Sequence, residues 1–533
     1  MKRLSPKVLF DSSDLESRIL ERSVSGGVIS IGAQCLQFVL QLAGTSLLAR
    51  LLSPADYGTV AMAAIVVGFV SMFKDAGLSM ATIQQARVTR AQINNLFWLN
   101  CGMTLVMAAV VLLLAPVVAR FYGKPCLAPV TAVLSVSFLI SGVTIQHQAL
   151  LQRHMMFGPV AVVRIASYLV YVLASAILAW YGMRYWSLVC GSLLQTTCSS
   201  LLCYYFCPWR PGRYEPATRV RAMLSFGGYL TGFDFLNYCA RNLDNLLLGR
   251  FWGPDALGLY SRAYSLLTLP IQQLTRPLAS VAIPALSRLQ EQPDRYKAYY
   301  LKVVALLGCI SMPAVMYLVV MAREVVELLL GGRWREAASI YMLLGISAIG
   351  QPIASTTGWL FVSQGRTKEM FRWGVIGSTL TVCAIVLGLP WGPKGVALAY
   401  SVFNCAAAPL LFYYACRKGP VGALDIVRAI VAPLWASGCT CGALLGVREL
   451  FKGSSAGITM AVGAGVTLAV VPLALAVSVK GRCQLKECCR LVGVLVELVR
   501  ARLGPGGVGG LNVDRDGPNS ARPNNSCSVT TPG

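Results

Sequence analysis

Long apolar stretches separated by short polar connections fill most of the chain. Each stretch holds about 20 mostly apolar residues, the length that an α-helix needs to cross a membrane. We therefore predict an all-α polytopic membrane protein with about fourteen transmembrane helices. The spans are expected at 25–48, 57–80, 93–118, 126–148, 157–182, 185–206, 223–249, 257–281, 299–320, 338–362, 369–390, 395–416, 423–447 and 455–479.

A weak repeat relates two parts of this pattern. Residues 25–63 recur without a gap at residues 225–263. Several matches are glycine, proline or arginine, which a shared apolar composition favours least. Weak internal symmetry of this kind is typical of secondary transporters. The matched pairs are Ser25/Ser225, Gly27/Gly227, Gly32/Gly232, Leu36/Leu236, Leu47/Leu247, Leu48/Leu248, Arg50/Arg250, Pro54/Pro254, Gly58/Gly258 and Ala63/Ala263.

The repeat predicts two six-helix lobes, residues 1–207 and 208–416, that start on the same side of the membrane. A second marker supports this division. Gly182-Met-Arg184 and Gly392-Pro-Lys394 each place a basic residue two positions after a glycine, just before an apolar helix. A basic linker around 208–221 is expected to join the lobes.

The remainder of the chain lies outside the repeat. Residues 417–480 are predicted to form two accessory helices. Residues 481–503 have the pattern of a basic amphipathic helix on the inner leaflet, with a further soluble helix as the alternative. Residues 504–533 are rich in Gly, Pro, Asn and Ser and are predicted to be disordered.

Composition and charge fit a membrane protein with a fixed orientation. Hydrophobic residues make up 56% of the chain and charged residues 13%, with mean hydropathy +0.62, whereas soluble proteins carry about 25% charged residues. The net charge of +24 is explained by basic cytoplasmic loops, so we expect no nucleic-acid partner. The same bias predicts that both termini are cytoplasmic. Residues 1–22 mix acidic and basic side chains and do not resemble a cleavable signal peptide.

Residues suited to catalysis or metal binding are sparse. His147 and His154 are the only histidines, which argues against histidine-based metal or acid–base sites. Most of the 18 cysteines fall within predicted spans, where free cysteine acts as a small buried hydrophobe. We therefore expect no enzyme activity, no catalytic residue, no metal and no cofactor.

The seventh predicted span carries a polar stripe that the repeat relates to the first span. Its members share one helical face, and each central charge costs about 2.5–3.5 kcal/mol in a membrane. The stripe must therefore either face a cavity or join helices through a structural network of polar contacts. The first span carries a stripe at the equivalent positions, and this favours one cavity that both helices line. The residues are Asp234, Asn237, Arg241 and Asp244, matched by Gln34, Gln37 and Gln41; Arg241 and Asp244 are also expected to pair.

Other charged residues lie inside or near the predicted spans. Lys74, Asp75 and Arg262 are expected to extend toward the membrane surface. Arg164 and Arg276 lie deeper and face either a cavity or a helix interface. Arginine suits phosphate because its planar guanidinium donates paired hydrogen bonds. The carboxylates argue against a purely anionic substrate, and they either pair with arginine or bind a coupling cation.

Five segments resemble motifs of bacterial polysaccharide flippases, members of the multidrug/oligosaccharidyl-lipid/polysaccharide exporter superfamily. Together they are similar to the lipopolysaccharide and exopolysaccharide branch, which includes colanic-acid-type exporters. Each segment alone has low specificity for this family. They are Ala49-Arg-Leu-Leu-Ser-Pro-Ala-Asp-Tyr-Gly58, Leu151-Gln-Arg-His-Met-Met-Phe157, Trp209-Arg-Pro211, Gly249-Arg-Phe-Trp-Gly-Pro-Asp-Ala-Leu-Gly-Leu-Tyr260 and Leu330-Gly-Gly-Arg-Trp334.

The resemblance implies two six-helix lobes around a central cavity in the inner membrane. It also implies an oligosaccharide on an undecaprenyl diphosphate carrier as substrate, moved to the outer leaflet by alternating access. Surrounding membrane lipids and the polysaccharide polymerase and export machinery are the candidate partners. In this reading Arg241 and Arg276 hold the pyrophosphate, and Gln34, Gln37, Gln41 and Asn237 bind sugar.

The sequence leaves two other functions open. A cation-coupled small-molecule exporter of the same superfamily would use Asp234 or Asp244 as its coupling carboxylate. A membrane glycosyltransferase or polymerase would need acidic residues on a sizeable outer loop, and the predicted outer loops are short.

Overall fold

The computed structural model describes residues 19–490 apart from 76–78, 80, 81, 83–87, 216–220, 488 and 489. The side chains of 19–29, 31, 221–237, 239 and 240 are outside this description. The part of the chain that is described contains helices and no strand. The first lobe contains α2 (Ile19–Leu51), α3 (Pro54–Ser71), α5 (Arg90–Tyr122), α6 (Leu127–Gly142), α7 (Ile145–Arg153), α8 (Phe157–Trp180) and α9 (Tyr185–Phe206).

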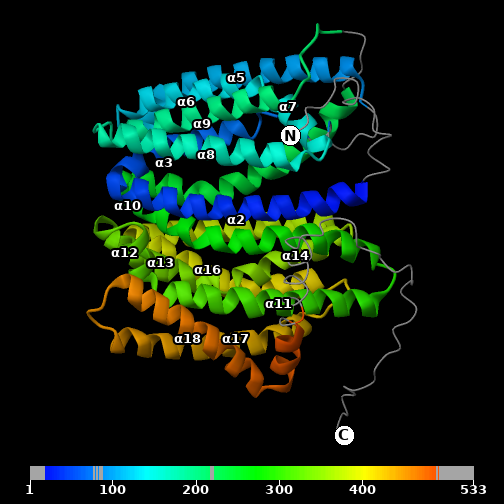
Figure 1. Ribbon diagram of the computed structural model, residues 1–533, viewed down its shortest axis with the longest axis vertical. Helices are drawn as coiled ribbons and strands as arrows, with labels where there is room; N and C mark the ends of the chain where they lie inside the picture. The colour runs from blue at the N-terminus through cyan, green and yellow to red at the C-terminus, as the bar shows by residue number, and fades with distance from the viewer. Residues whose placement is uncertain are drawn as a thin grey trace, which may run out of the picture.

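The second lobe begins with α10 (Arg221–Arg288) and is followed by the two accessory helices, α17 (Ala423–Leu450) and α18 (Ala456–Val477). In Figure 1, α2 and α10 lie between the remaining helices of the two lobes. The other elements of the second lobe are α11 (Pro293–Val320), α12 (Ala322–Leu329), η1 (Gly332–Trp334), α13 (Arg335–Ala348), α14 (Gln351–Ser363), α15 (Thr367–Gly388), η2 (Leu389–Trp391) and α16 (Gly392–Cys416).

All fourteen expected stretches overlap helices, although α3 ends at Ser71, before the end of the stretch 57–80. Fewer helices pass a strict test for membrane crossing. Seven described helical segments are long and apolar enough, or nine when two bent helix pairs are counted. One of the seven, residues 367–416, contains both α15 and α16. Helices α2 and α10 are not among them, and some side chains of each lie outside the described residues. The all-α membrane fold is confirmed, and fourteen spans remain compatible with it.

A glycine divides α10 into two limbs that match the seventh and eighth expected spans. Gly253 has φ 82° and ψ −174°, a conformation that is essentially restricted to glycine. It is the one residue with non-helical dihedral angles inside α10. The equivalent position in the first lobe is Ser53, whose side chain accepts a hydrogen bond from Asp56 N and starts α3. Both lobes therefore turn at the same place in the repeat.

The two turns pack against each other, and we call this contact between Pro54–Gly58 and Pro254–Gly258 the clasp. A Cβ on Gly58 would overlap the carbonyl group of Pro254, and a Cβ on Gly258 would overlap that of Pro54. Only glycine lets two backbones approach this closely. The contact thus joins the lobes at one end of the helices, the clasped end, on the left of Figure 1.

Trp334 reinforces the clasp from the second lobe. Its side chain is fully buried, and its indole Nε1 donates to the carbonyl of Ala49 at the end of α2, at 2.9 Å. Its ring meets the ring of Tyr57 edge-on at 5.4 Å between centroids. Close by, Arg50 Nη2 donates to the carbonyl of Leu328. The Leu330–Trp334 motif therefore closes the clasped end by contact with the first lobe.

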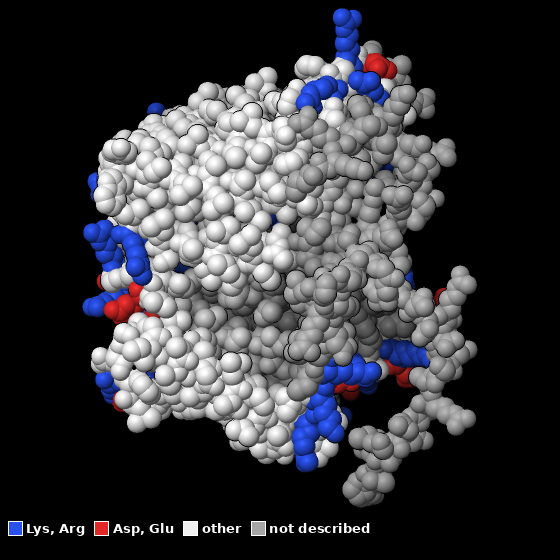
Figure 2. Space-filling view, viewed as in Figure 1, with Lys and Arg blue, Asp and Glu red and all other residues white. Residues whose placement is uncertain are grey.

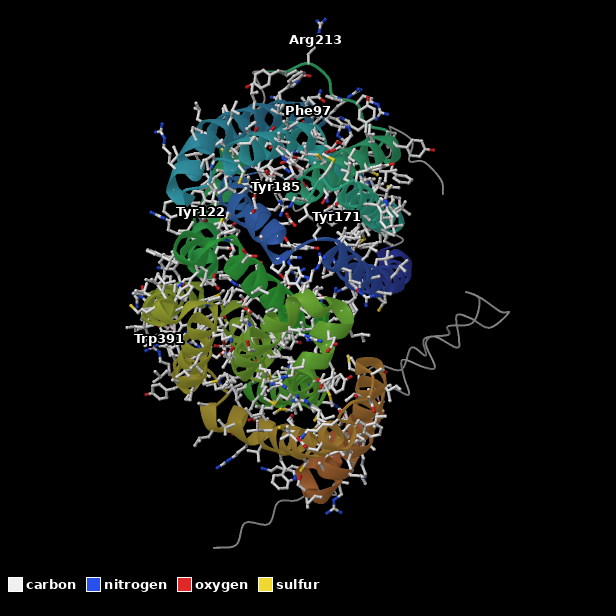
Figure 3. All side chains as sticks on the ribbon, turned by 90° about the vertical axis from the view of Figure 1, so that its left-hand side faces the viewer. Phe97, Tyr122, Tyr171, Tyr185, Arg213 and Trp391 are labelled. Atoms are coloured by element: carbon white, nitrogen blue, oxygen red, sulfur yellow. The ribbon has the colours of Figure 1, made fainter. Side chains whose placement is uncertain are left out.

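Charged side chains gather at the two ends of the helices. Figure 2 shows them at the left edge of this face and toward its right side, with a broad white belt between them. Exposed aromatic side chains, such as Trp180 and Trp391, mark the clasped end, which faces the viewer in Figure 3. Aromatic residues at the ends of spans are typical of the membrane interface.

The accessory helices pack against the second lobe. Arg448 of α17 lies 3.2 Å from Glu324 of α12, and Tyr317 of α11 donates to the carbonyl of Met460 in α18. Only the start of the expected amphipathic segment 481–503 is described, and it is helical. There, Glu487 pairs with Lys302 of α11 at 2.7 Å. The tail 504–533 is outside the described residues, and the proposed domain boundaries remain predictions.

Candidate functional site

A cavity of about 1500 Å³ lies between the two lobes. Its walls come from α2 and α8 of the first lobe and from the second limb of α10. Polar and aromatic side chains dominate the lining, which consists of Ser30, Gln34, Gln37, Gln41, Thr45, Leu48, Tyr57, Met155, Phe157, Arg164, Tyr168, Tyr171, Arg262, Ser265, Thr268, Leu269, Gln272, Gln273, Arg276, Pro277, Ser280 and Val281.

The cavity extends along more than half of the length of these helices. On α2 it reaches from Leu48, next to the clasp, to Ser30. Eighteen residues of helix correspond to about 27 Å. At the clasped end the lobes are held together by the clasp and by Trp334. The arrangement is a deep hollow whose clasped end is closed by packed backbone and aromatic rings.

Arginines supply all the charge among the described residues that line the cavity. Arg164 projects from α8, and Arg262 and Arg276 project from α10. Arg276 donates to the amide oxygen of Gln272 at 3.0 Å. Arg262 lies over the ring of Tyr57 at 4.5 Å from the centroid. The described lining contains no carboxylate, so it attracts anions.

The amides of α2 provide hydrogen-bonding groups along the first-lobe wall. Gln34, Gln37 and Gln41 all line the cavity, as do Gln272 and Gln273 opposite them. The side-chain oxygen of Gln37 is buried and has no hydrogen-bond partner. Gln34 donates to Gln273, so one amide pair connects the lobes across the cavity. Amides that line a cavity are suited to bind a hydroxylated ligand.

The Gln34–Gln273 bridge leads to a testable prediction. Gln34→Ala and Gln273→Ala should be non-additive in thermal unfolding of the purified protein in detergent, because each removes the same hydrogen bond. We expect a coupling of about 0.5–1.5 kcal/mol. Gln41→Ala, a cavity amide two turns away, should be additive with Gln273→Ala. Additive behaviour of the first pair would show that the bridge contributes nothing.

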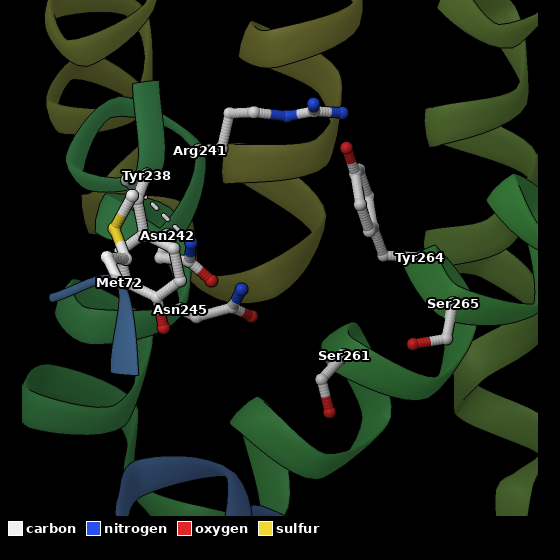
Figure 4. A pocket seen from close by; sticks show the side chains of 8 residues that line it. All are labelled: Met72, Tyr238, Arg241, Asn242, Asn245, Ser261, Tyr264 and Ser265. Carbon is white, nitrogen blue, oxygen red and sulfur yellow. Dashed lines mark hydrogen bonds between the residues drawn. The ribbon is translucent and has the colours of Figure 1, made fainter. Parts of the chain in front are cut away.

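Arg241 lines a second hollow of about 560 Å³, between the two limbs of α10. In Figure 4, its side chain extends toward Tyr264, with Asn242 and Asn245 on its own limb and Ser261 and Ser265 on the other. Ser265 also lines the large cavity, so the two spaces are neighbours. The exposed guanidinium of Arg241 therefore lies beside the main cavity rather than within it.

Asp244 is buried and does not form the expected pair with Arg241. Tyr260 Oη donates to its carboxylate at 2.8 Å, and the backbone N of Asn245 donates at 2.7 Å. Among the described ion pairs, none joins Arg241 to Asp244. The expected pair is wrong because Tyr260, from the other limb, satisfies the carboxylate. Asp244 and Arg241 border a small pocket of about 200 Å³ toward α15 and α16.

The polar stripe is thus only partly assembled into one wall. The first-lobe amides line the large cavity, whereas Arg241 and Asp244 line the adjoining pockets. The side chains of Asp234 and Asn237 lie outside the described residues. Substrate binding by these residues stays a prediction.

Several lining residues were missed or misplaced by sequence reasoning. Arg262 was expected to reach the membrane surface, but it lines the cavity and contacts Tyr57. Arg164, left open between cavity and interface, lines the cavity, as Arg276 does. The polar Gln272–Gln273 pair within an apolar stretch was a signal for this wall.

Lys74 and Asp75 follow the end of α3 and are half-buried. The carboxylate of Asp75 accepts hydrogen bonds from the backbone N and the hydroxyl of Ser79, at 3.1 and 2.9 Å. The pair is therefore part of the local packing and does not extend freely to the surface as expected.

Comparison with known proteins identifies the family. The model of a family described as polysaccharide biosynthesis protein matches residues 47–339. This chain belongs to that family. The matched region contains both turns of the clasp and Trp334. The resemblance to polysaccharide flippases of the multidrug/oligosaccharidyl-lipid/polysaccharide exporter superfamily is confirmed.

Individual relatives agree with this assignment. The lipopolysaccharide biosynthesis protein WzxC of Escherichia coli K12 is 25% identical over 418 residues, which cover 78% of this chain and 84% of WzxC. The teichuronic acid biosynthesis protein TuaB of Bacillus subtilis 168 is 25% identical over 346 residues, 64% of this chain and 71% of TuaB. This family member is therefore a multi-pass membrane protein of polysaccharide biosynthesis.

A solved structure shares the fold. The lipid II flippase MurJ in an inward closed conformation superimposes with a TM-score of 0.66 over 85% of this chain and 98% of MurJ. Sequence identity is 12%, so the likeness concerns the architecture alone. It supports the helical membrane fold of this family member.

Proposed function

We propose that this protein is a flippase that moves an undecaprenyl-diphosphate-linked oligosaccharide across the inner membrane for surface polysaccharide or lipopolysaccharide synthesis. The observation that carries the proposal is the cavity between the lobes, which is lined by three arginines and several amides and closed at the clasped end. A substrate with an anionic group and many hydroxyls matches this lining.

The arginines and the amides would have different roles. Arg164 and Arg276 face the cavity from opposite lobes, and a diphosphate between them would accept paired hydrogen bonds from both. Gln34, Gln37 and Gln41 would bind sugar hydroxyls. Arg241 borders the neighbouring hollow, so it would contact the substrate only where the substrate extends past Ser265 into that hollow.

The proposed orientation places the clasped end outside. Basic residues gather at the opposite end of the helices, and the positive-inside rule then assigns that end to the cytoplasm. Examples are Arg295, Lys297, Arg366 and Lys418. Parting the clasp while the opposite end closes would give alternating access. In this view the structure represents a state closed toward the outside.

The charge of the cavity argues against the small-molecule alternative. Its described lining carries three arginines and no carboxylate, which disfavours a cationic drug. Asp244, one of the two coupling carboxylates in that alternative, is held by Tyr260 outside the large cavity. The side chain of the other, Asp234, lies outside the described residues. The flippase is therefore the function that this geometry supports best.

Replacing both Arg164 and Arg276 by glutamine should test the proposal. We expect transport of an undecaprenyl-diphosphate oligosaccharide in liposomes to fall at least about tenfold, the equivalent of one charge-assisted hydrogen bond. A deletion strain carrying the variant should lose surface polysaccharide while the protein level in the membrane is unchanged.

Arg335→Gln is the matched control, because Arg335 is exposed and pairs with Glu327 away from the cavity. It should transport like the native protein. Native-level transport by the Arg164→Gln/Arg276→Gln variant would refute the assignment of the cavity as the diphosphate site.

A further inference from the structure

The connection between the two lobes begins with a segment that is fastened to the first lobe. Residues 207–215, which we call the strap, follow the end of α9 and contain neither helix nor strand. Helix α9 starts next to Arg184, which contacts Asp56 of the clasp, and its 22 residues lead to the opposite end of the molecule. In Figure 1 the strap lies above the right-hand end of α5. The strap is therefore at the end that the clasp does not close.

Trp209 anchors the start of the strap. Its side chain is 2% exposed. Its ring meets the ring of Phe97 in α5 edge-on at 5.8 Å between centroids, and that of His147 in α7 at 5.0 Å. The guanidinium of Arg210 lies 3.8 Å from the centroid of the Tyr204 ring in α9. These contacts hold the start of the strap against three helices of the first lobe.

Two neighbouring asparagines of α5 hold the rest of the strap by its backbone. Asn95 donates from Nδ2 to the carbonyl of Glu215 at 2.7 Å and accepts from the backbone N of Glu215 at 2.8 Å. Asn94 accepts from the backbone N of Gly212 at 3.1 Å, and Trp98 Nε1 donates to the carbonyl of Gly212 at 2.9 Å. An amide suits this role because it both donates and accepts. Both backbone groups of each strap residue are thus bonded to α5.

This fastening is closer than a surface connection requires. Connecting segments usually leave their backbone groups to water. Here a Cβ on Gly212 would lie 2.5 Å from Nδ2 of Asn94, so glycine allows the close approach. In Figure 3, Arg213 points away from the lobe. The strap therefore turns its backbone toward α5 and its charged side chain outward.

Docking of the strap shortens the free connection between the lobes. Helix α10 begins at Arg221, six residues after Glu215, and six residues span at most about 20 Å. Without the dock, the connection would start at Phe206, the last residue of α9, fifteen residues before Arg221. Fifteen residues span about 50 Å. The dock therefore reduces the greatest distance between the first lobe and the start of α10 by about 30 Å.

We propose that the strap limits how far the two lobes separate at the end opposite the clasp. The inference rests on the proposed flippase function, because alternating access requires this end to open and close. Backbone contact closes the clasped end. At the other end, a short covalent connection that starts from a fixed point on α5 sets the widest opening.

Distances between two spin labels test the strap. The labels are attached to cysteines that replace Gln152 and Ser287, which are exposed at this end of the first and second lobes. The full-length, cysteine-depleted protein is placed in phosphatidylethanolamine/phosphatidylglycerol liposomes, and double electron–electron resonance gives the distance distribution. Eight glycine and serine residues inserted between Glu215 and Arg221 leave the strap docked but lengthen the connection by up to about 26 Å. The longest populated distance should then rise by at least about 5 Å.

Variants of the dock separate the possible outcomes. Asn94→Ala/Asn95→Ala frees the strap from α5 and should give the same increase as the insertion. Gln148→Ala, at an exposed position of the same end, should match the native protein. Unchanged distances in the insertion variant would overturn the proposal, and an increase in the asparagine variant alone would assign these residues only to the folding of the first lobe.

Transport by the native protein separates this inference from the function on which it rests. An undecaprenyl-diphosphate oligosaccharide is added to the same liposomes, and a membrane-impermeant glycosidase reports the fraction of glycan on each leaflet. If the native protein moves no glycan, the proposed function fails. The label distances would still decide whether the strap limits the separation of the lobes.

Discussion

Gly58→Leu is expected to abolish transport, because the clasp can no longer close. A Cβ at this position would overlap the carbonyl of Pro254 and lie 2.8 Å from its Cα, and these are backbone atoms that cannot rotate away. The two lobes would have to separate at the clasped end. Gly258→Leu should give the same result, since its Cβ would overlap the carbonyl of Pro54.

The loss of transport is measured as surface polysaccharide in a deletion strain that carries the variant. The loss of closure is measured by labelling a single cysteine that replaces Ser265 in a cysteine-depleted protein. In the glycine variants, this cysteine should react with a membrane-impermeant maleimide added from the clasped side. Gly32→Ala is the control, because a Cβ there meets no atom within 4 Å. Native transport by Gly58→Leu would show that the lobes need not touch here.

Trp334→Ala should cause the largest loss of stability among single substitutions outside the clasp glycines. The side chain is fully buried, and its removal leaves a large cavity and an unpaired carbonyl at Ala49. Truncating a buried tryptophan costs about 3–5 kcal/mol. The lost edge-on contact with Tyr57 also weakens the joint between the lobes.

Thermal unfolding in detergent measures this cost, and labelling of the cysteine at Ser265 measures opening of the clasped end. Trp334→Phe keeps a ring against Tyr57 but loses the indole donor, so it should cost about 1 kcal/mol. Equal unfolding temperatures for the native protein and Trp334→Ala would contradict the role assigned to this residue.

Much of the fold was accessible from the sequence, because membrane crossing imposes a strong hydrophobic signal. The helix positions and the two lobes followed from apolar runs and from the repeat. The clasp did not: matching Gly58 to Gly258 shows that the positions are equivalent, but it contains no information that they touch. That contact depends on how the lobes dock, which no local pattern encodes.

The cavity was predictable only in part, for a related reason. Gln34, Gln37 and Gln41 line it as their stripe indicates. Arg262 was misplaced because closeness to a span end suggests an interfacial side chain, whereas it lies over the ring of Tyr57 and lines the cavity. Asp244 lost its expected partner because Tyr260 approaches from the other limb of α10.

The reciprocal form of the clasp explains where the two halves of the chain still resemble each other. Gly58 meets Pro254 while Gly258 meets Pro54, so a side chain added on either half collides with the other. Mutual contact of this kind constrains both copies at once. Gln41 and Arg241 lie outside the clasp, and there the paired positions differ. The identical pairs Pro54/Pro254 and Gly58/Gly258 are therefore the ones that this contact explains.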